Sequence, residues 1–212
     1  MTGLILHGYF RSSAAWRVRI ALHLKGVAFD QRPHHLRRGE QRDPGYLALN
    51  PQGLVPALQV EDGVVLTQSL AIIEYLDRRY PAPGFLPESP AARAQAQAVA
   101  LAVACDVHPL QNLRVLDRLR GLGQTEDEVQ AWARGVIEEG LDACERLLPP
   151  ARGAFAFGER PGLADICLVP QLANARRFAA ELRWPRLLEI EAAASAHPAF
   201  QAAAPERQPD ME

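Results

Sequence analysis

A short apolar strand gives way to a helix in the segment Tyr9-Phe10-Arg11-Ser12-Ser13-Ala14-Ala15-Trp16-Arg17-Val18-Arg19-Ile20-Ala21-Leu22. The run Leu4-Ile5-Leu6 in front of it is too short for a helix and is typical of a buried strand. Apolar side chains then follow helical spacing up to Gly26, a common helix stop. Ser12 or Ser13 is therefore predicted to cap the helix N-terminus.

A helix N-terminus of this kind is suited to holding an anion. Its first N–H groups have no partners within the helix and carry partial positive charge. A thiolate placed there gains from the dipole, from the backbone donors and from a serine O–H. Capping alone is the commonest role of such a serine, and these residues by themselves favour that simpler role.

The chain has 212 residues and a formal charge of −2 at pH 7. This length allows a substantial core, in one large domain or two small ones, and the charge leaves no basic excess for binding nucleic acid. The sequence has no run of about eighteen apolar residues and no charged-then-apolar start. We therefore expect a cytoplasmic protein without a membrane segment.

Motifs of several other protein classes are missing from the sequence. Cys105, Cys144 and Cys167 show neither CxxC nor zinc spacing and cannot pair completely, so we expect reduced structural thiols. His34-His35 is the only histidine cluster and lacks further ligands, so no metal is expected. Neither GxGxxG nor GxxxxGK[ST] occurs, which argues against a nucleotide cofactor.

A second strand is indicated by alternation at Val27, Phe29 and Gln31, which makes the start of the chain β-α-β. Further on, the proline of Val55-Pro56 cannot donate to a central ladder. Either it opens a strand or its peptide bond is cis, which would turn the Val55 backbone outward to pair with an extended ligand. Because most X–Pro bonds are trans, the residues alone do not favour the cis form.

A hairpin and a second helix complete this part of the chain. Asp62-Gly63 joins strands predicted at 57–60 and 64–66. Gln68-Ser69 precedes a helical pattern, so Ser69 is predicted to be a second N-cap. Two helix N-termini in one small α/β domain offer one seat for a thiolate and one for a carboxylate.

The composition changes after a proline-rich segment that runs from Tyr80 to Pro90 and indicates a linker. From Ala91 to about Ala204 the sequence is rich in Ala, Leu, Arg and Glu, has helical periodicity and shows no credible strand. This part is predicted to be an all-helical domain.

In order and spacing, these features resemble the glutathione transferases, and best of all the zeta class, which includes maleylacetoacetate and maleylpyruvate isomerases. The matching segments cover nearly the whole chain: Arg11-Ser12-Ser13, Trp16–Leu22, Ala48–Pro51, Val55-Pro56, Gln68–Glu74, Leu163–Asp165, Leu168–Gln171, Ala173–Phe178 and Arg207–Asp210.

The resemblance implies an α+β thioredoxin-like N-terminal domain over residues 1–81, a linker over 82–88 and an all-α C-terminal domain over 89–212. It further implies a cis Val55–Pro56 bond, a homodimer and glutathione as the cofactor. Ser12 and Ser13 would meet the glutathione sulfur, the backbone at Val55-Pro56 would pair with the cysteinyl part, and Gln68 and Ser69 would hold the γ-glutamyl carboxylate.

The resemblance also assigns roles to polar residues of the second domain. His108, Gln111, Asn112 and Arg114 would lie on its first helix, where zeta-class residues approach the ligands, with His108 and Asn112 at glutathione. By spacing alone, such a polar stripe is the ordinary exterior of a surface helix.

The reaction implied is the isomerisation of a cis double bond in a small dicarboxylic keto acid. A thiolate that adds in conjugate fashion makes that bond single long enough for it to rotate, and then leaves. Two carboxylates call for cations, and Arg11, Arg114 and Arg177 are the candidates, with Arg176 as an alternative to Arg177. Ser12, Ser13 and Arg11 would form the catalytic group.

Two residues depart from the zeta-class pattern. Ala14 stands where members commonly have a cysteine, so any reactive sulfur must come from glutathione alone. Gly162 stands where a serine or threonine usually caps the helix ahead of Asp165. Glycine costs only about a few tenths of a kcal/mol there, so the helix is still expected.

The sequence leaves three alternative functions. The arginines favour the isomerase, and Arg114, as an additional cation, slightly favours the more compact maleylpyruvate over maleylacetoacetate. A general transferase or peroxidase acting on small electrophiles such as α-halo acids would give Arg11 and Arg114 no productive role. A non-catalytic binding protein of the same fold is disfavoured by the intact Ser12, Gln68 and Ser69.

Overall fold

The computed structural model describes residues 3–212, and its contacts divide the chain into two compact units. The first is the chain up to Gly84 together with Ala196–Glu212, and the second is Phe85–Ser195. Residues 1–2, which open the predicted N-terminal domain, lie outside the described part. None of the helices described within 3–212 combines the length and apolar character needed to cross a bilayer.

The first unit is built on a four-stranded sheet in the order β2-β1-β3-β4, formed by β1 (Ile5–Gly8), β2 (Asp30–Pro33), β3 (Ala57–Gln59) and β4 (Val65–Thr67). β1 and β2 are parallel because helix α1 (Ser13–Leu24) carries the chain back between them. β3 and β4 are antiparallel because they are joined through the tight turn at Asp62-Gly63, where Gly63 has a φ of 74°. The predicted β-α-β start and the hairpin are both confirmed.

The predicted second strand was placed too early in the sequence. Residues 27–29 are not in a strand, and pairing begins only at Asp30. The apolar Phe29 instead packs edge-to-face against His23 near the end of α1, with ring centroids 5.4 Å apart. Its place in the alternating pattern therefore reflects packing against the helix and not membership of the sheet.

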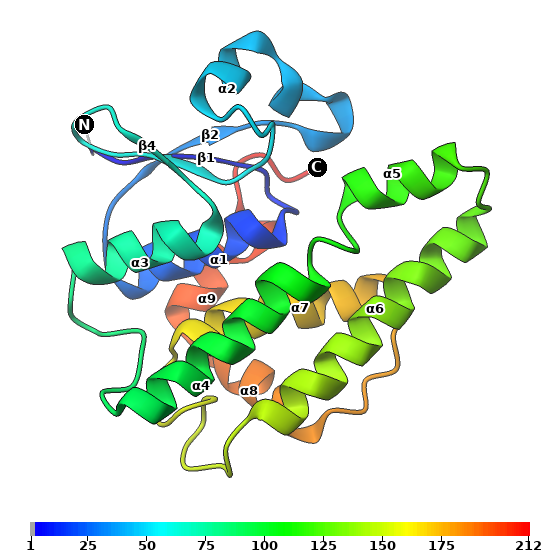
Figure 1. Cartoon of the computed structure of the whole chain (residues 1–212). Coiled ribbons are helices and arrows are strands. Elements are labelled where there is room, and N and C mark those ends of the chain that lie inside the picture. The colour runs from blue at the N-terminus through cyan, green and yellow to red at the C-terminus, as the bar shows by residue number, and fades with distance from the viewer. Residues whose placement is uncertain (1–2) are drawn as a thin grey trace. The chain divides into compact units, whose positions relative to one another are not determined.

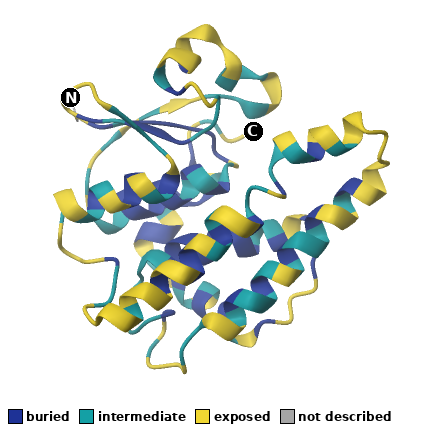
Figure 2. Cartoon of the chain, viewed as in Figure 1, coloured by how far each residue is buried: buried dark blue, intermediate teal, exposed yellow. Residues whose placement is uncertain are grey.

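Helices cover both faces of the sheet (Figure 1). α1 and α3 (Ser69–Arg79) pack together on one face, and α2 (Pro44–Leu49) lies on the other after two short 3-10 turns, Leu36–Arg38 and Glu40–Arg42. β1 lies between these layers and is coloured as buried along most of its length (Figure 2). Apolar residues on both sides of this central strand are thereby removed from water, which is the main stabilising contribution.

The second unit is helical, as predicted, and consists of α4 (Pro90–Leu101), a π-helical turn (Ala102–Val107), α5 (Leu113–Gly121), α6 (Glu126–Leu147), α7 (Leu163–Arg177) and α8 (Pro185–Ala196), whose last residue is grouped with the first unit. α7 is its buried centre. α6 is amphipathic, with buried and exposed residues on opposite sides in Figure 2.

Helix α7 forms although Gly162 provides no capping side chain. The Asp165 carboxylate accepts hydrogen bonds from the Gly162 N–H and the Ala156 N–H, each at 2.8 Å. Burial raises the pKa of this carboxyl group to about 6, partly opposed by those backbone donors. The expectation that the helix survives the glycine is confirmed, because Asp165 supplies the N-terminal contacts from inside the helix.

The end of the chain belongs to the first unit. α9 (Pro198–Ala203) packs against α1 and is followed by a 3-10 turn, Pro205–Arg207. The predicted domains were consecutive stretches of sequence, whereas the contacts return Ala196–Glu212 to the N-terminal unit. The alanine-rich composition of the helical part continues through α9. Composition therefore does not indicate that the end of the chain packs with the N-terminal unit.

Candidate active site

Three segments meet at one end of the sheet because of its register. β1 ends at Gly8, and its His7 pairs with Ala57, the first residue of β3. Ala57 pairs in turn with Thr67, the last residue of β4. The chain segments just beyond these positions therefore emerge together, and they contain the predicted glutathione residues of the first domain: Ser12, Ser13, Val55, Pro56, Gln68 and Ser69.

Ser12 is the N-cap of α1. Its backbone is extended, with φ −69° and ψ 114°, and its Oγ accepts a hydrogen bond from the Ala15 N–H at 3.2 Å. Ser13 is the first helical residue and is buried, whereas Ser12 is half-buried. Because a hydroxyl oxygen that accepts a hydrogen bond can still donate its own hydrogen, Ser12 can serve both its helix and an anion placed at the helix end.

The prediction that Ser69 caps α3 is wrong by one residue. Gln68 occupies the N-cap position with a φ of +68°, and its side chain makes no capping bond. Its Nε2 donates instead to Gln52 Oε1 at 2.9 Å, across the loop before β3. Ser69 is the first helical residue, is buried, and accepts a hydrogen bond at Oγ from Arg17 Nη1 at 3.4 Å.

The Val55–Pro56 bond is cis, as the family resemblance implied and the residues alone did not favour. The preceding loop is held by buried Asn50, whose Nδ2 donates to the Leu54 carbonyl at 2.7 Å and whose Oδ1 accepts from the Gln52 N–H at 3.1 Å. The Tyr46 hydroxyl donates to the same Leu54 carbonyl at 2.6 Å. The backbone that leads into Val55 is therefore held by side-chain hydrogen bonds.

The polar residues predicted on the first helix of the second domain do not share one helix. α4 gives way to the π-helical turn, and a further turn through Pro109 separates His108 from α5. Asn112 caps α5, accepting from the Arg114 N–H at 3.2 Å. Gln111 is buried and donates to Gln171 Oε1 at 3.0 Å, so the solvated-stripe interpretation is wrong for it.

The candidate substrate cations differ in their surroundings. Arg11, Arg114 and Arg177 are all exposed. The Arg11 and Arg177 guanidinium groups lie over the rings of the neighbouring Phe10 and Phe178, at 5.7 and 5.5 Å from the ring centroids. Arg176 instead forms an ion pair with Glu191 at 2.5 Å. Of the two adjacent arginines, Arg176 is thus committed to a structural ion pair.

Sequence reasoning missed two buried arginines beside the site. Arg17 and Arg19 are each 1 % exposed on α1. Arg17 reaches Ser69, and Arg19 binds the backbone carbonyls of the turn that leads to Ser12. The available signal was the alternation of these two cations with the large apolar residues Trp16, Val18 and Ile20, because a cation on the apolar side of a helix requires buried acceptors.

Cys105, Cys144 and Cys167 all lie in the second unit, whereas Ser12 belongs to the first. Burial raises the pKa of the Cys144 thiol to about 12, which keeps it protonated and unreactive at neutral pH. The first unit therefore offers hydroxyls and helix ends to a bound sulfur, but no thiol of its own among the described residues.

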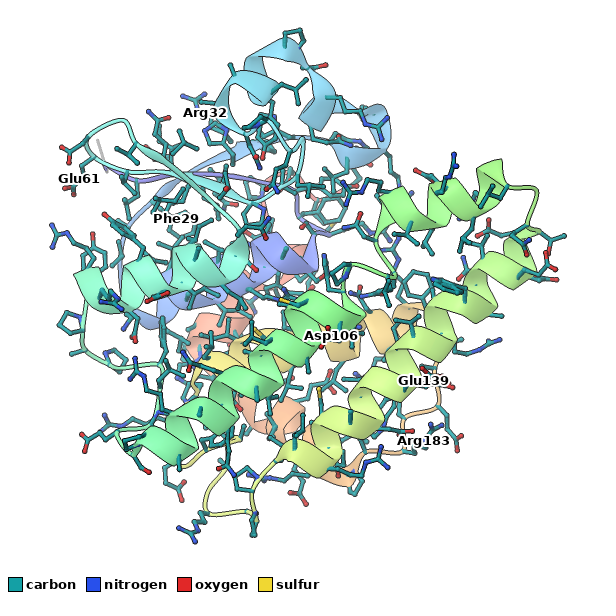
Figure 3. The ribbon with its side chains drawn as sticks, in the orientation of Figure 1. Phe29, Arg32, Glu61, Asp106, Glu139 and Arg183 are labelled. Carbon is teal, nitrogen blue, oxygen red and sulfur yellow. The ribbon has the colours of Figure 1, made fainter. Side chains whose placement is uncertain are left out.

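A pocket of about 440 Å³ elsewhere on the first unit is lined by Ile5, His7, Arg32, Pro33, His34 and Gln59. It adjoins the face of the sheet that carries α2, and Arg32 at its rim is labelled in Figure 3. His7 Nδ1 lies 2.9 Å from His34 Nε2. Burial, together with the nearby His34 and Arg32, lowers the pKa of His7 to about 4. None of the predicted site residues lines this pocket.

Comparison with known proteins places the chain in a family. A family model described as "Glutathione S-transferase, N-terminal domain" matches residues 11–79, and one described as "Glutathione S-transferase, C-terminal domain" matches residues 90–202. A maleylacetoacetate isomerase from Pseudomonas aeruginosa is 50% identical over 208 residues, which cover 97% of each chain.

Solved structures agree with the sequence comparison. A holo maleylpyruvate isomerase, described as a bacterial glutathione S-transferase of the zeta class, has a TM-score of 0.95 at 43% identity and covers 98% of this chain and 100% of its own. A maleylacetoacetate isomerase from Anaeromyxobacter dehalogenans, with dicarboxyethyl glutathione and citrate in its active site, has a TM-score of 0.89 at 43% identity and covers 99% of this chain and 97% of its own. The chain therefore belongs to the glutathione S-transferase family, as a member of its zeta class.

Proposed function

We propose that this chain is a glutathione-dependent cis–trans isomerase that acts on maleylacetoacetate or maleylpyruvate. The observation that carries the proposal is the meeting of two helix N-termini and the cis Val55–Pro56 segment at one end of the sheet. It is found in a chain that is similar over its whole length to isomerases named for both substrates.

The residues at the end of the sheet fit glutathione. A tripeptide with one thiol and two carboxylates needs a seat for a sulfur anion, a backbone edge and a seat for a carboxylate. The α1 N-terminus with Ser12 suits the sulfur, and the supported backbone at Val55 suits the peptide. The α3 N-terminus suits the γ-glutamyl carboxylate, because Ser69 and the buried cation of Arg17 stand there together.

Bound glutathione supplies a soft nucleophile that adds to the substrate double bond and is released unchanged after the bond has rotated. The contribution of the chain is to keep that sulfur ionised at neutral pH. The Ser12 hydroxyl and the partial positive charge at the N-terminus of α1 stabilise negative charge, and so they lower the pKa of a thiol held there. Ser13, the next residue, adds a second hydroxyl to the same turn.

The substrate is an anion at both ends, so it requires cations besides the sulfur seat. Arg11 directly precedes Ser12 and is exposed, as a ligand for an incoming carboxylate must be. In the second domain, Arg114 and Arg177 are exposed arginines at positions matching the family pattern. A guanidinium binds a carboxylate through two parallel hydrogen bonds and thereby orients it for attack. His108 and Asn112 are proposed as further glutathione ligands.

We base the proposed domain boundaries and oligomeric state on the same family. Residues 1–81 form the glutathione-binding domain, residues 82–88 are a linker, and residues 89–212 form the substrate domain, although Ala196–Glu212 belong to the first compact unit. We further propose a cytoplasmic homodimer, in keeping with three cysteines that form no disulfide. Sedimentation equilibrium of the purified chain tests the dimer.

The decisive experiment measures the loss of conjugated absorbance of maleylacetoacetate and of maleylpyruvate with and without glutathione. We expect turnover only with glutathione and no net consumption of its thiol. Steady consumption of thiol, with an α-halo acid as the better substrate, would instead identify a conjugating transferase. Absence of glutathione binding by calorimetry would reject both enzymes and leave a non-catalytic protein of this fold.

A further inference from the structure

The C-terminal segment reaches back to the turn that carries the sulfur seat. Asp210 Oδ2 accepts a hydrogen bond from the Phe10 N–H at 2.9 Å, across 200 residues of sequence. Phe10 lies in the turn between β1 and α1, two residues before Ser12. Figure 1 shows this last part of the chain, in red, returning to the N-terminal unit.

Arg19 binds the carbonyl groups of the same turn. Its Nη2 donates to the Phe10 carbonyl at 2.9 Å and its Nη1 to the Tyr9 carbonyl at 3.4 Å, while its Nε donates to the Ala203 carbonyl at 3.0 Å. The Tyr9 carbonyl also accepts from the Ser12 N–H at 3.0 Å, closing the turn. One buried guanidinium thus joins the end of α9 to the turn that presents Ser12.

The tail is itself anchored so that Asp210 has a defined position. Gln208 is buried, and its Nε2 donates to the Ala204 carbonyl at 2.7 Å and the Ala202 carbonyl at 3.0 Å. Its Oε1 accepts from Gln31 Nε2 at 3.1 Å, on strand β2. Asp210 therefore extends from a fixed point. Burial lowers the pKa of Arg19 to about 10, and the Asp210 carboxylate partly opposes that shift.

We propose that Asp210 and Arg19 are positioning residues of the glutathione site, which fix the Tyr9–Ser12 turn so that the Ser12 hydroxyl and Arg11 face the reacting atoms. This rests on the proposed function. The physical reason is that the hydrogen bond from Ser12 to the sulfur and the bonds from Arg11 to a substrate carboxylate both depend steeply on geometry. A turn between a strand and a helix has few constraints of its own. The C-terminal segment supplies the missing constraint.

The test compares Asp210→Ala, Asp210→Glu and Glu206→Gln in the full chain. Glu206 is exposed in the same segment, so Glu206→Gln is the control that removes one tail carboxylate charge while leaving the turn contacts in place. The readouts are kcat, the KM for glutathione and for the dicarboxylic acid, and the pKa of bound glutathione from its thiolate absorbance. Thermal unfolding is measured alongside to identify any variant that fails to fold.

We expect Asp210→Ala to lower kcat about tenfold at neutral pH, to raise the pKa of the bound thiol, and to raise the KM for the dicarboxylic acid. Asp210→Glu should recover most of kcat, and Glu206→Gln should stay within about twofold of the unmodified chain. An Asp210→Ala protein that melts earlier but keeps the kcat and thiol pKa of the unmodified chain would show that the contact is only structural, and would overturn the proposal.

Failure of the proposed function has a different signature. If the unmodified chain shows no glutathione-dependent turnover, the isomerase assignment fails. Amide hydrogen exchange at Phe10 and Ser12 still reports on the turn itself. Faster exchange in Asp210→Ala than in Glu206→Gln supports the proposal that Asp210 holds the turn. Equal exchange in the two variants overturns it.

Discussion

Arg17 and Ser69, 52 residues apart in the chain, meet where α1 passes the first turn of α3, with Nη1 3.4 Å from Oγ. Arg17 is 1 % exposed, so its charge lies in a medium where it interacts strongly with its neighbours. A buried cation beside a helix N-terminus makes that end a stronger seat for a carboxylate than the dipole alone would.

This pair should therefore control the affinity for glutathione. We expect Ser69→Ala to raise the KM for glutathione about tenfold, through the loss of a hydrogen bond to a charged group. Arg17→Lys should do the same, because an ammonium group cannot reproduce the guanidinium fork. If the two residues act together, the double variant will show less than the sum of the two free-energy changes. Full additivity in calorimetric titrations would contradict the coupling.

Ser12→Ala should lower glutathione-dependent turnover by more than about tenfold, since the variant loses the hydroxyl that stabilises the thiolate. The variant also loses a helix cap, which costs about 1 kcal/mol of stability. Thr125→Ala is the matched control, because Thr125 caps α6 in the other unit through a bond from the Glu128 N–H at 3.3 Å. A similar loss of turnover in both variants would mean that capping alone explains the effect.

The KM for the dicarboxylic substrate should distinguish Arg11 and Arg114 from an ordinary surface arginine. Arg11→Ala and Arg114→Ala are each expected to raise the KM for the dicarboxylic substrate about tenfold, because each removes a charge-assisted hydrogen bond. Arg118→Ala changes an exposed arginine one turn further along α5 and should leave this KM unchanged. Unchanged kinetics in all three variants would remove the isomerase assignment.

His7 should make the stability of the protein depend on pH. Its pKa is about 4 in the folded chain against 6.5 in the unfolded one, so between these values the unfolded state binds more protons. The free energy of unfolding is then expected to rise as the pH increases from about 4 to 6.5, and the contribution is lost on acidification. Urea titrations across this range should show a shallower rise for His7→Phe. An identical rise in the variant would assign the effect to other groups.

The fold was largely readable from local patterns. The strand before Tyr9, the helix that ends before Gly26, the Asp62-Gly63 hairpin and the helical second half each depend on residues close in sequence, where periodicity and turn chemistry operate. The errors were local as well. Phe29 was included in a strand although it packs against His23, and Ser69 was named as a cap although Gln68 holds that position.

The site was readable only in part. A cap at Ser12 or Ser13 followed from their place before an apolar helix, but the choice of Ser12 came from the structure. The cis Val55–Pro56 bond followed only from the family resemblance. The interruption of the helix before His108 and the burial of Gln111 had no local signature, because a polar stripe looks the same whether it is solvated or paired with a distant helix.

Residues close together along the chain were enough to establish two helix N-termini, a hairpin and a helical domain, because backbone preferences act over a few residues. Folding in three dimensions settled which of these parts share a site. Strand register carried Ser12, Val55 and Ser69 to one end of the sheet, and the packing of α9 on α1 brought Asp210 to the Phe10 amide. Such contacts join groups up to 200 residues apart. They arise from burial and strand pairing over the whole unit, and residues that are neighbours in sequence do not determine them.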